Sequence, residues 1–234
     1  MGRTGILASV TTSPCRPTGA PTDAPTHAPT SVPTGPSTAP RPGDVTAAPA
    51  TLRRLRPAHR PPVPDVVRRA DLPLSAWTGL HLDGVLVPLW RDTSRVAGTV
   101  EDPAVRAGAL ATVVPRRGAV GRLSAAWVHV GGPPPRRVTV LVRSGARRPD
   151  PHPDRAVAEA DLTDDDVQQL GGVPVTTVLS TAVDVARWVP ADRAVPVLRA
   201  LVRAGLDPAD AVRRLEAHAG GRGVRTARQV LRQV

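Results

Sequence analysis

The chain has 234 residues and a formal net charge of +11, and all 31 of its cationic side chains are arginine because lysine is absent. The lack of lysine excludes Schiff-base chemistry and a lysine-containing phosphate loop. Tryptophan is the only aromatic residue type, with four copies. So few rings argue against a stacking platform for single-stranded nucleic acid. A single cysteine, Cys15, excludes a disulfide framework and a cysteine zinc site.

The first 50 residues are rich in Pro, Thr and Ala, with little apolar surface to bury. Proline fixes φ and lacks an amide hydrogen, so this composition predicts a disordered tail. An SH3-like ligand or a glycosylated stalk is the alternative interpretation of such a segment. The apolar stretch 5–10 is shorter than the ~7–15 residues of a signal-peptide core, and no run approaches the ~20 residues of a membrane span. We therefore expect a cytoplasmic protein.

Residues 51–99 form the second predicted region, in which 8 Arg stand against 4 Asp. The pattern predicts short helices at 52–56 and 64–70, and a further helix at 74–82 with apolar residues at helical spacing. An apolar strand, a polar turn and a return strand follow between residues 85 and 97, which predicts a hairpin. Two short helices followed by a hairpin is the order of a winged helix-turn-helix.

The same region supplies the candidate contacts to double-stranded DNA. In a winged helix the second helix enters the major groove and the hairpin, or wing, touches the backbone. Arginines around the helix would position phosphates, and polar residues of helix 74–82 would read bases. The predicted DNA-binding set is Arg68, Arg69, Ser75, Thr78, His81, Arg91 and Arg95.

Residues 100–234 form the third predicted region, a mostly helical domain around a small β-sheet. Helices are expected at 102–113 and 122–130, strands at 137–143 and 156–159, and a short extended piece at 173–175. Four consecutive helices are expected at 177–189, 192–204, 208–219 and 223–233. On the helix from Thr177, we expect Val178, Thr181 (or Ala182) and Val185 to face inward, with Trp188 buried near its end. The predicted fold class of the whole chain is therefore α+β.

Three charged patterns in this region have a functional and a structural interpretation. The acidic run Asp161, Asp164, Asp165 and Asp166 could hold a divalent cation, but Thr163 with Asp166 matches a helix-capping box, which we prefer. The six histidines share no metal-ligand spacing, so no metal site is predicted. Arg222, Arg225, Arg228 and Arg232 form a basic stripe, which is either a partner surface or a solvated helix face.

Several segments resemble the AbiEi-type abortive-infection antitoxins, in their actinobacterial branch. The series 66–72, the helix that follows it and 83–86 look like the N-terminal winged helix of that family. Gly121 to Trp127 is similar to its Ser-Ala-Ala-x-Trp helix, and 137–140 to its core strand. The most specific likeness is 172–177 followed by 181–186. The resemblance covers about residues 64–234, with Ser180 where the family usually has Arg.

The resemblance implies a non-enzymatic antitoxin of a type IV toxin–antitoxin system. Such a protein binds operator repeats, represses its own operon and counteracts a nucleotidyltransferase toxin. It implies no cofactor, no metal, no catalytic residue and no small-molecule substrate. The alternative function is a protein-interaction module whose winged helix has lost DNA binding. A hydrolase or nuclease with an unrecognised site is the alternative from the enzyme class.

Overall fold

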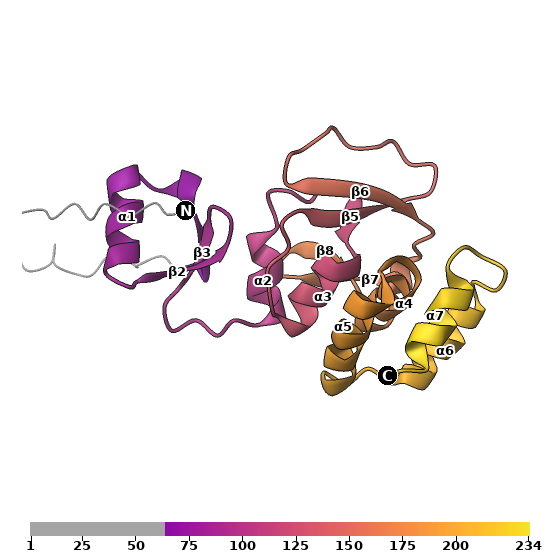
Figure 1. Ribbon diagram of the computed structural model, residues 1–234. Coiled ribbons are helices and arrows are strands. Elements are labelled where there is room, and N and C mark those ends of the chain that lie inside the picture. Colours follow the sequence, from indigo (N-terminus) through magenta and orange to yellow (C-terminus); the bar gives the residue numbers. More distant parts are fainter. Residues whose placement is uncertain (1–63) are drawn as a thin grey trace, which may run out of the picture. The chain divides into compact units, whose positions relative to one another are not determined.

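The computed structural model describes residues 64–234, which contain seven α-helices and two β-sheets. The α+β class predicted from the sequence is confirmed for this part of the chain (Figure 1). The predicted tail at 1–50 and the predicted helix at 52–56 lie outside the described residues. None of the helices between residues 64 and 234 combines the length and the apolar run that a membrane crossing requires.

Residues 64–97 fold as a three-stranded antiparallel sheet with one helix. Its elements are β1 (Val66–Arg68), a 3-10 turn (Arg69–Asp71), α1 (Leu74–Leu82), β2 (Leu86–Trp90) and β3 (Thr93–Val96). The strand order is β1-β3-β2, so β1 and β2 lie on either side of β3. The predicted helix at 74–82 and the hairpin after it are confirmed.

The helix predicted at 64–70 is wrong, because these residues form β1 and the 3-10 turn. Val66 and Val67 are β-branched and suit a strand better than a helix. Strand β3 supplies the partner, with Val66 opposite Arg95. An isolated helix of seven residues has no comparable source of hydrogen bonds and is marginal in water. Within the described residues, α1 is therefore preceded by a strand.

Strand β2 is an edge strand of the small sheet and has two irregular features. Pro88 lies in its middle, opposite Ser94, and carries no amide hydrogen. The register shifts between Pro88 and Trp90, which marks a bulge. The buried Trp90 donates its indole N–H to the carbonyl of Pro135, 2.8 Å away, and so ties the hairpin to a loop of the following region.

The second sheet has five strands in the order β6-β5-β4-β8-β7. Its elements, with the two helices that accompany them, are α2 (Pro103–Ala109), β4 (Gly118–Val120), α3 (Arg122–Val130), β5 (Val138–Arg143), β6 (Arg155–Ala160), β7 (Val167–Leu170) and β8 (Val173–Thr176). The predicted strands at 137–143 and 156–159 and the predicted helix at 122–130 are confirmed. Helix α2 begins after Asp102 as expected, since its Oδ1 accepts the Val105 N–H, but it ends four residues early.

The sequence missed β4 and β7, which have three and four residues. The predicted capping box is present, but it opens only a 3-10 turn at Asp164–Asp166. Strand β7 begins directly after this turn. Gly171 and Gly172, both with positive φ, then reverse the chain, so that β7 and β8 pair as a hairpin.

The four helices predicted at the C-terminal end are confirmed. They are α4 (Val178–Trp188), α5 (Ala191–Arg203), α6 (Pro208–Glu216) and α7 (Val224–Leu231). Figure 1 shows them gathered beside the larger sheet, from orange to yellow. Thr177 caps α4 through its side chain, which accepts the Ser180 N–H, and Asp207 caps α6 with Pro208 at the first helical position.

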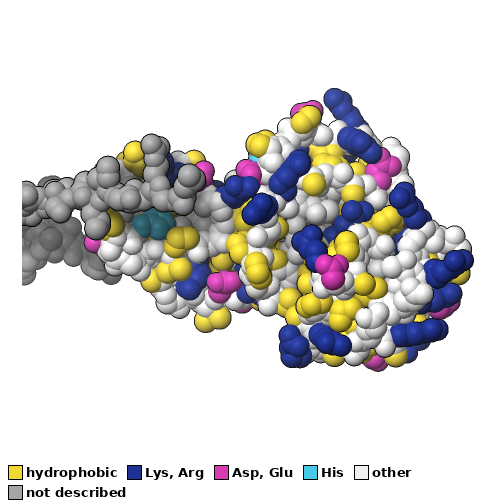
Figure 2. All heavy atoms as spheres, in the orientation of Figure 1, with side chains coloured by type: hydrophobic (Ala, Val, Ile, Leu, Met, Phe, Trp, Pro, Cys, Tyr) yellow, Lys and Arg dark blue, Asp and Glu magenta, His cyan; other side chains and the backbone are white. Residues whose placement is uncertain are grey.

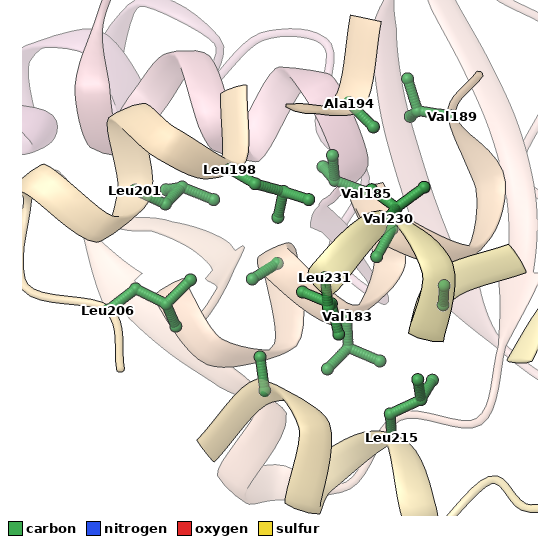
Figure 3. Close-up of a cluster of buried hydrophobic side chains, with 14 of the residues drawn as sticks. Val183, Val185, Val189, Ala194, Leu198, Leu201, Leu206, Leu215, Val230 and Leu231 are labelled. Atoms are coloured by element: carbon green, nitrogen blue, oxygen red, sulfur yellow. The ribbon is translucent and has the colours of Figure 1, made fainter. Parts of the chain in front are cut away.

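Two clusters of buried apolar side chains hold the described residues together. One cluster lies between α2, α3 and the larger sheet and includes Leu89 and Trp90 of the hairpin. The other lies between α4, α5, α6 and α7 and includes Val185, Leu198, Leu201 and Leu215, which are labelled in Figure 3. Thr181, Ala182 and Val185 face this core as predicted, and Val178 is half-buried against it.

Trp188 is not buried as the sequence predicted, since it is 37% exposed. Helix α4 ends at this residue, and the next residue, Val189, is extended and only 8% exposed. Val189 therefore takes the inward position that helical periodicity assigned to Trp188. The ring of Trp188 remains at the surface.

This placement makes Trp188→Ala a mild substitution and Leu198→Ala a severe one. Leu198 is fully buried, so Leu198→Ala should lower the free energy of unfolding by about 2–5 kcal/mol through lost burial and a cavity. Trp188→Ala should cost less, about 1–2 kcal/mol, because 37% of the residue already meets water and only the rest of its surface is buried. Urea unfolding of both variants measures the difference. Equal losses would contradict the partly exposed position of Trp188 at the end of α4.

Candidate functional site

The candidate DNA-reading residues lie on α1, a helix that buries none of its side chains. Ser75 and Thr78 are exposed on its surface. His81 is half-buried and has a structural role. Its Nδ1 lies 2.8 Å from the carbonyl of Trp77, to which it can donate, and its Nε2 lies 2.9 Å from the Ser94 hydroxyl. His81 therefore links α1 to β3.

Three of the four candidate phosphate-binding arginines already have partners within the protein. Arg68 is half-buried, with Nη2 3.5 Å from the Gly108 carbonyl. Arg95 donates to the Thr99 carbonyl at 3.0 Å and lies 3.8 Å from a Glu101 carboxylate oxygen. Arg91 is 3.0 Å from Asp154 and remains 50% exposed. Arg69 has no carboxylate of residues 64–234 within 4 Å.

Two arginines of the basic stripe near the C-terminus make contacts within the protein, and the other two are exposed. Arg228 of α7 forms an ion pair with Glu216 at 2.8 Å and so ties α7 to the end of α6. Arg225 and Arg232 are exposed. Arg222 precedes α7 and lies over the ring of Trp188. Figure 2 shows arginine side chains spread over the C-terminal helices on the face in view.

Asp166 is the centre of a polar cluster that joins the 3-10 turn at 164–166 to α4 and α6. It is 5% exposed and accepts hydrogen bonds from the Thr163 N–H at 2.9 Å and the Thr163 hydroxyl at 2.8 Å. The Ser180 hydroxyl and Arg214 Nη2 each donate to its Oδ1 at 2.6 Å. Burial alone would raise the pKa of Asp166, but the hydrogen bonds from Ser180, Thr163 and Arg214 outweigh it and hold the pKa at about 2.

Two of the other acidic residues of the run make ordinary contacts, and Asp165 is exposed. Asp164 pairs with Arg143, and Asp161 accepts the Ser144 hydroxyl at 2.6 Å. Among residues 64–234, no three His, Cys, Asp or Glu side chains come close enough to hold a metal ion.

A cavity of about 110 Å³ lies beside Asp166, and its wall includes Asp184, Arg187, Trp188, Arg214 and His218. Burial raises the pKa of Asp184 to about 6, although the charges of Arg122 and Arg187 oppose the shift. Burial and the charges of Arg187 and Arg214 lower the pKa of His218.

Three guanidinium groups lie over the ring of Trp188, and of these only Arg187 also lines the cavity. Their central carbons lie 5.2 Å (Arg122), 5.3 Å (Arg187) and 5.8 Å (Arg222) from the ring centroid. Arg187 also donates to the backbone carbonyl of Arg222 at 3.2 Å. Each distance is within the range of a cation–π contact.

Sequence reasoning found only part of this site. Thr163 and Asp166 were visible because a capping box is a local signal. Arg214 was not, since it lies 48 residues from its partner Asp166. The convergence of Arg122, Arg187 and Arg222 depends on three helix ends meeting in space, which no spacing in the sequence records.

Comparisons with protein families and with curated proteins find no match for this chain. Among solved structures, the chain is similar to the crystal structure of the RV2827C protein from Mycobacterium tuberculosis. The sequences are 20% identical, the match covers 73% of this chain and 72% of that chain, and the TM-score is 0.40. A likeness of this size assigns neither an activity nor a ligand.

Proposed function

We propose that this chain is a non-enzymatic, antitoxin-like regulator that binds double-stranded DNA at operator repeats. In this proposal it represses its own operon and counteracts a nucleotidyltransferase toxin, as the resemblance to AbiEi-type antitoxins implies. The observation that carries the DNA-binding part is α1, whose nine residues include none that is buried and which a hairpin follows directly. A helix followed by a hairpin matches the recognition helix and the wing of a winged helix-turn-helix, although β1 and a 3-10 turn occupy the place of the predicted preceding helix.

The contacts described above divide the candidate residues by role. Ser75 and Thr78 are exposed on α1 and are assigned to base edges. Arg69 and the half-exposed Arg91 are assigned to phosphates. The remaining candidates have structural contacts: His81 links α1 to β3, Arg68 donates to the Gly108 carbonyl of α2, and Arg95 donates to the Thr99 carbonyl.

A salt titration tests the phosphate contacts. Each neutralised phosphate releases condensed counterions, so log K should fall with log salt at about −0.9 per contact. Replacing Arg69 and Arg91 together by Ala should flatten that slope by up to ~2 and weaken all duplexes alike. The matched control replaces the exposed Arg225 and Arg232, which removes the same charge from α7 and the residue after it. An equal change in both double variants would contradict the assigned phosphate contacts.

The base contacts need a separate comparison between the chain's own upstream region and a scrambled duplex. Ser75→Ala and Thr78→Ala should reduce the preference for the upstream region by about 1–3 kcal/mol per lost contact. Equal affinity of the unchanged protein for both duplexes would exclude an operator binder. Co-expression with an adjacent nucleotidyltransferase gene tests the antitoxin part, because relief of growth arrest is the expected result.

A protein-interaction module is the second candidate function, and exposed apolar side chains favour it. Leu82 at the end of α1 is 82% exposed, Val85 beside it is 42% exposed, and Val100 is 76% exposed. The carboxylates of Asp154 and Glu101, beside Arg91 and Arg95, also reduce the net positive charge of this region. If the duplex experiment shows no sequence preference, this function takes first place.

A further inference from the structure

The cluster of arginines around Trp188 carries more positive charge than its surroundings balance. The ion pairs within residues 64–234 use other arginines, so Arg122, Arg187 and Arg222 have no carboxylate oxygen within 4 Å there. Like charges held this close repel one another, more strongly where water is partly excluded. The arrangement is therefore complementary to an anion that is not part of residues 64–234.

The acidic groups around the cavity do not fill this role. Asp166 is bound to Arg214, and Glu159 accepts from Arg148 at 3.1 Å. Asp161 is bound to Ser144. Asp184 is the one cavity-lining carboxyl for which no hydrogen bond or ion pair is present among the described residues. One carboxylate against three guanidinium groups leaves about two positive charges, which matches a phosphate monoester.

The side chain and the backbone of Arg122 each have an unusual feature. Its Nε is buried and makes no hydrogen bond with residues 64–234, a feature that it shares with the Nε atoms of Arg68, Arg95 and Arg155. Its backbone has a φ of +52°, which an arginine seldom adopts. Such a conformation costs about 1–3 kcal/mol and is common at functional sites. Here it accompanies a guanidinium group that lies over Trp188.

The size of the cavity and the exposed ring limit the class of anion. About 110 Å³ is far below the ~300–1,000 Å³ of a pocket that encloses a whole small molecule. It has room for a phosphate group and part of a sugar. Trp188 is 37% exposed, so an aromatic base outside the cavity can contact the part of the ring that the three guanidinium groups leave uncovered. Stacking on an aromatic side chain is sequence-tolerant because every base has a π-face.

We propose that this cluster binds a free nucleotide, with the phosphate held by Arg122, Arg187 and Arg222 and the base stacked on Trp188. Asp184, on the cavity wall, accepts hydrogen bonds from the sugar hydroxyls. This site is separate from α1 and the hairpin, so it does not depend on the proposed operator binding.

Calorimetric titration of the full chain with adenosine 5′-monophosphate, adenosine and inorganic phosphate tests the proposal. The monophosphate should bind at least about tenfold more tightly than either fragment, because guanidinium bonds to phosphate and ring stacking each contribute. Arg222→Ala should weaken the monophosphate at least about tenfold. Arg225→Ala is the matched control, since it removes the same charge from an exposed position nearby and should leave the affinity unchanged.

A second pair of measurements separates the base from the phosphate. Trp188→Leu should weaken the monophosphate several-fold and leave the affinity for inorganic phosphate unchanged, while the unfolding transition reports that the variant is folded. Equal effects of Arg222→Ala and Arg225→Ala would overturn the proposal, because the binding would then follow net charge alone. Binding of a 5′-phosphorylated single-stranded oligonucleotide without binding of the monophosphate would overturn it too.

Discussion

Asp166→Ala is expected to lower the free energy of unfolding by about 3–5 kcal/mol, as the loss of one partner of a buried ion pair usually does. The substitution removes the acceptor of four hydrogen bonds, from the N–H and hydroxyl of Thr163, from Ser180 and from Arg214. It leaves the Arg214 guanidinium without its carboxylate. Because Thr163, Ser180 and Arg214 come from a turn and two helices, α4 and α6 should loosen together.

Urea unfolding followed by circular dichroism measures this loss. Asp165→Ala is the matched control, since Asp165 lies in the same 3-10 turn but is exposed. It should change stability by no more than about 0.5 kcal/mol. Asp166→Asn keeps the shape and loses the charge, so its cost should fall between the two. A similar small effect for Asp165→Ala and Asp166→Ala would show that the hydrogen bonds of Asp166 contribute little.

The same carboxylate also predicts how stability depends on pH. The pKa of Asp166 is lowered from 3.8 to about 2 in the folded protein. Its contribution is therefore fully present above the ordinary pKa and is lost as the pH falls from about 4 to about 2. The stability difference between the unchanged protein and Asp166→Ala should shrink over this interval. A difference that stays constant down to about pH 2 would contradict the lowered pKa.

Gly171→Ala should be nearly as damaging, although it adds a single methyl group. A Cβ at this position would lie 2.2 Å from the backbone carbonyl oxygen of Ala104 in α2, and its φ is +52°. The left-handed conformation costs an L-residue about 1–2 kcal/mol, and overpacking against backbone adds about 1–3 kcal/mol or more. We expect a loss of at least about 3 kcal/mol in urea unfolding and a displacement of α2 from the β7–β8 hairpin.

Gly172→Ala separates the two contributions. Gly172 has a φ of +75°, and a Cβ added there would meet no atom within 4 Å beyond its neighbours in the chain, so only the conformational cost applies. Its loss should be about 1–2 kcal/mol. If both alanine variants lose the same amount, the close approach of Ala104 is not what requires glycine at position 171.

Local signals explain which parts of the fold were predictable from the sequence. Helix 74–82, the hairpin after it and the four C-terminal helices have apolar periodicity with clear breaks, and all are present. The segment at 64–70 was mispredicted because its structure depends on the distant strand β3, with Val66 opposite Arg95. Strands β4 and β7 are too short to show a repeat, and only their partners in the sheet define them.

The candidate sites were less predictable because their chemistry depends on long-range contacts. The capping residues Thr163 and Asp166 are three positions apart, which a sequence pattern can show. The contact between Arg214 and Asp166 depends on how α6 packs in the fold. The exposure of Trp188 depends on where α4 ends. Likewise, His81 was a plausible base-reading residue until the Ser94 hydroxyl proved to lie 2.9 Å from its ring.

The irregular edge of the small sheet restricts how other molecules can approach it. An apolar strand with a free row of backbone groups would recruit a strand from a second molecule. In β2, Pro88 offers no amide hydrogen, and the bulge before Trp90 breaks the regular spacing of the remaining groups. Extension of the sheet by a fourth strand is therefore disfavoured at this edge. A molecule that binds residues 64–97 near the β2 edge must therefore contact side chains and not backbone groups. The side chains of α1 and of the hairpin tip then determine which partner binds.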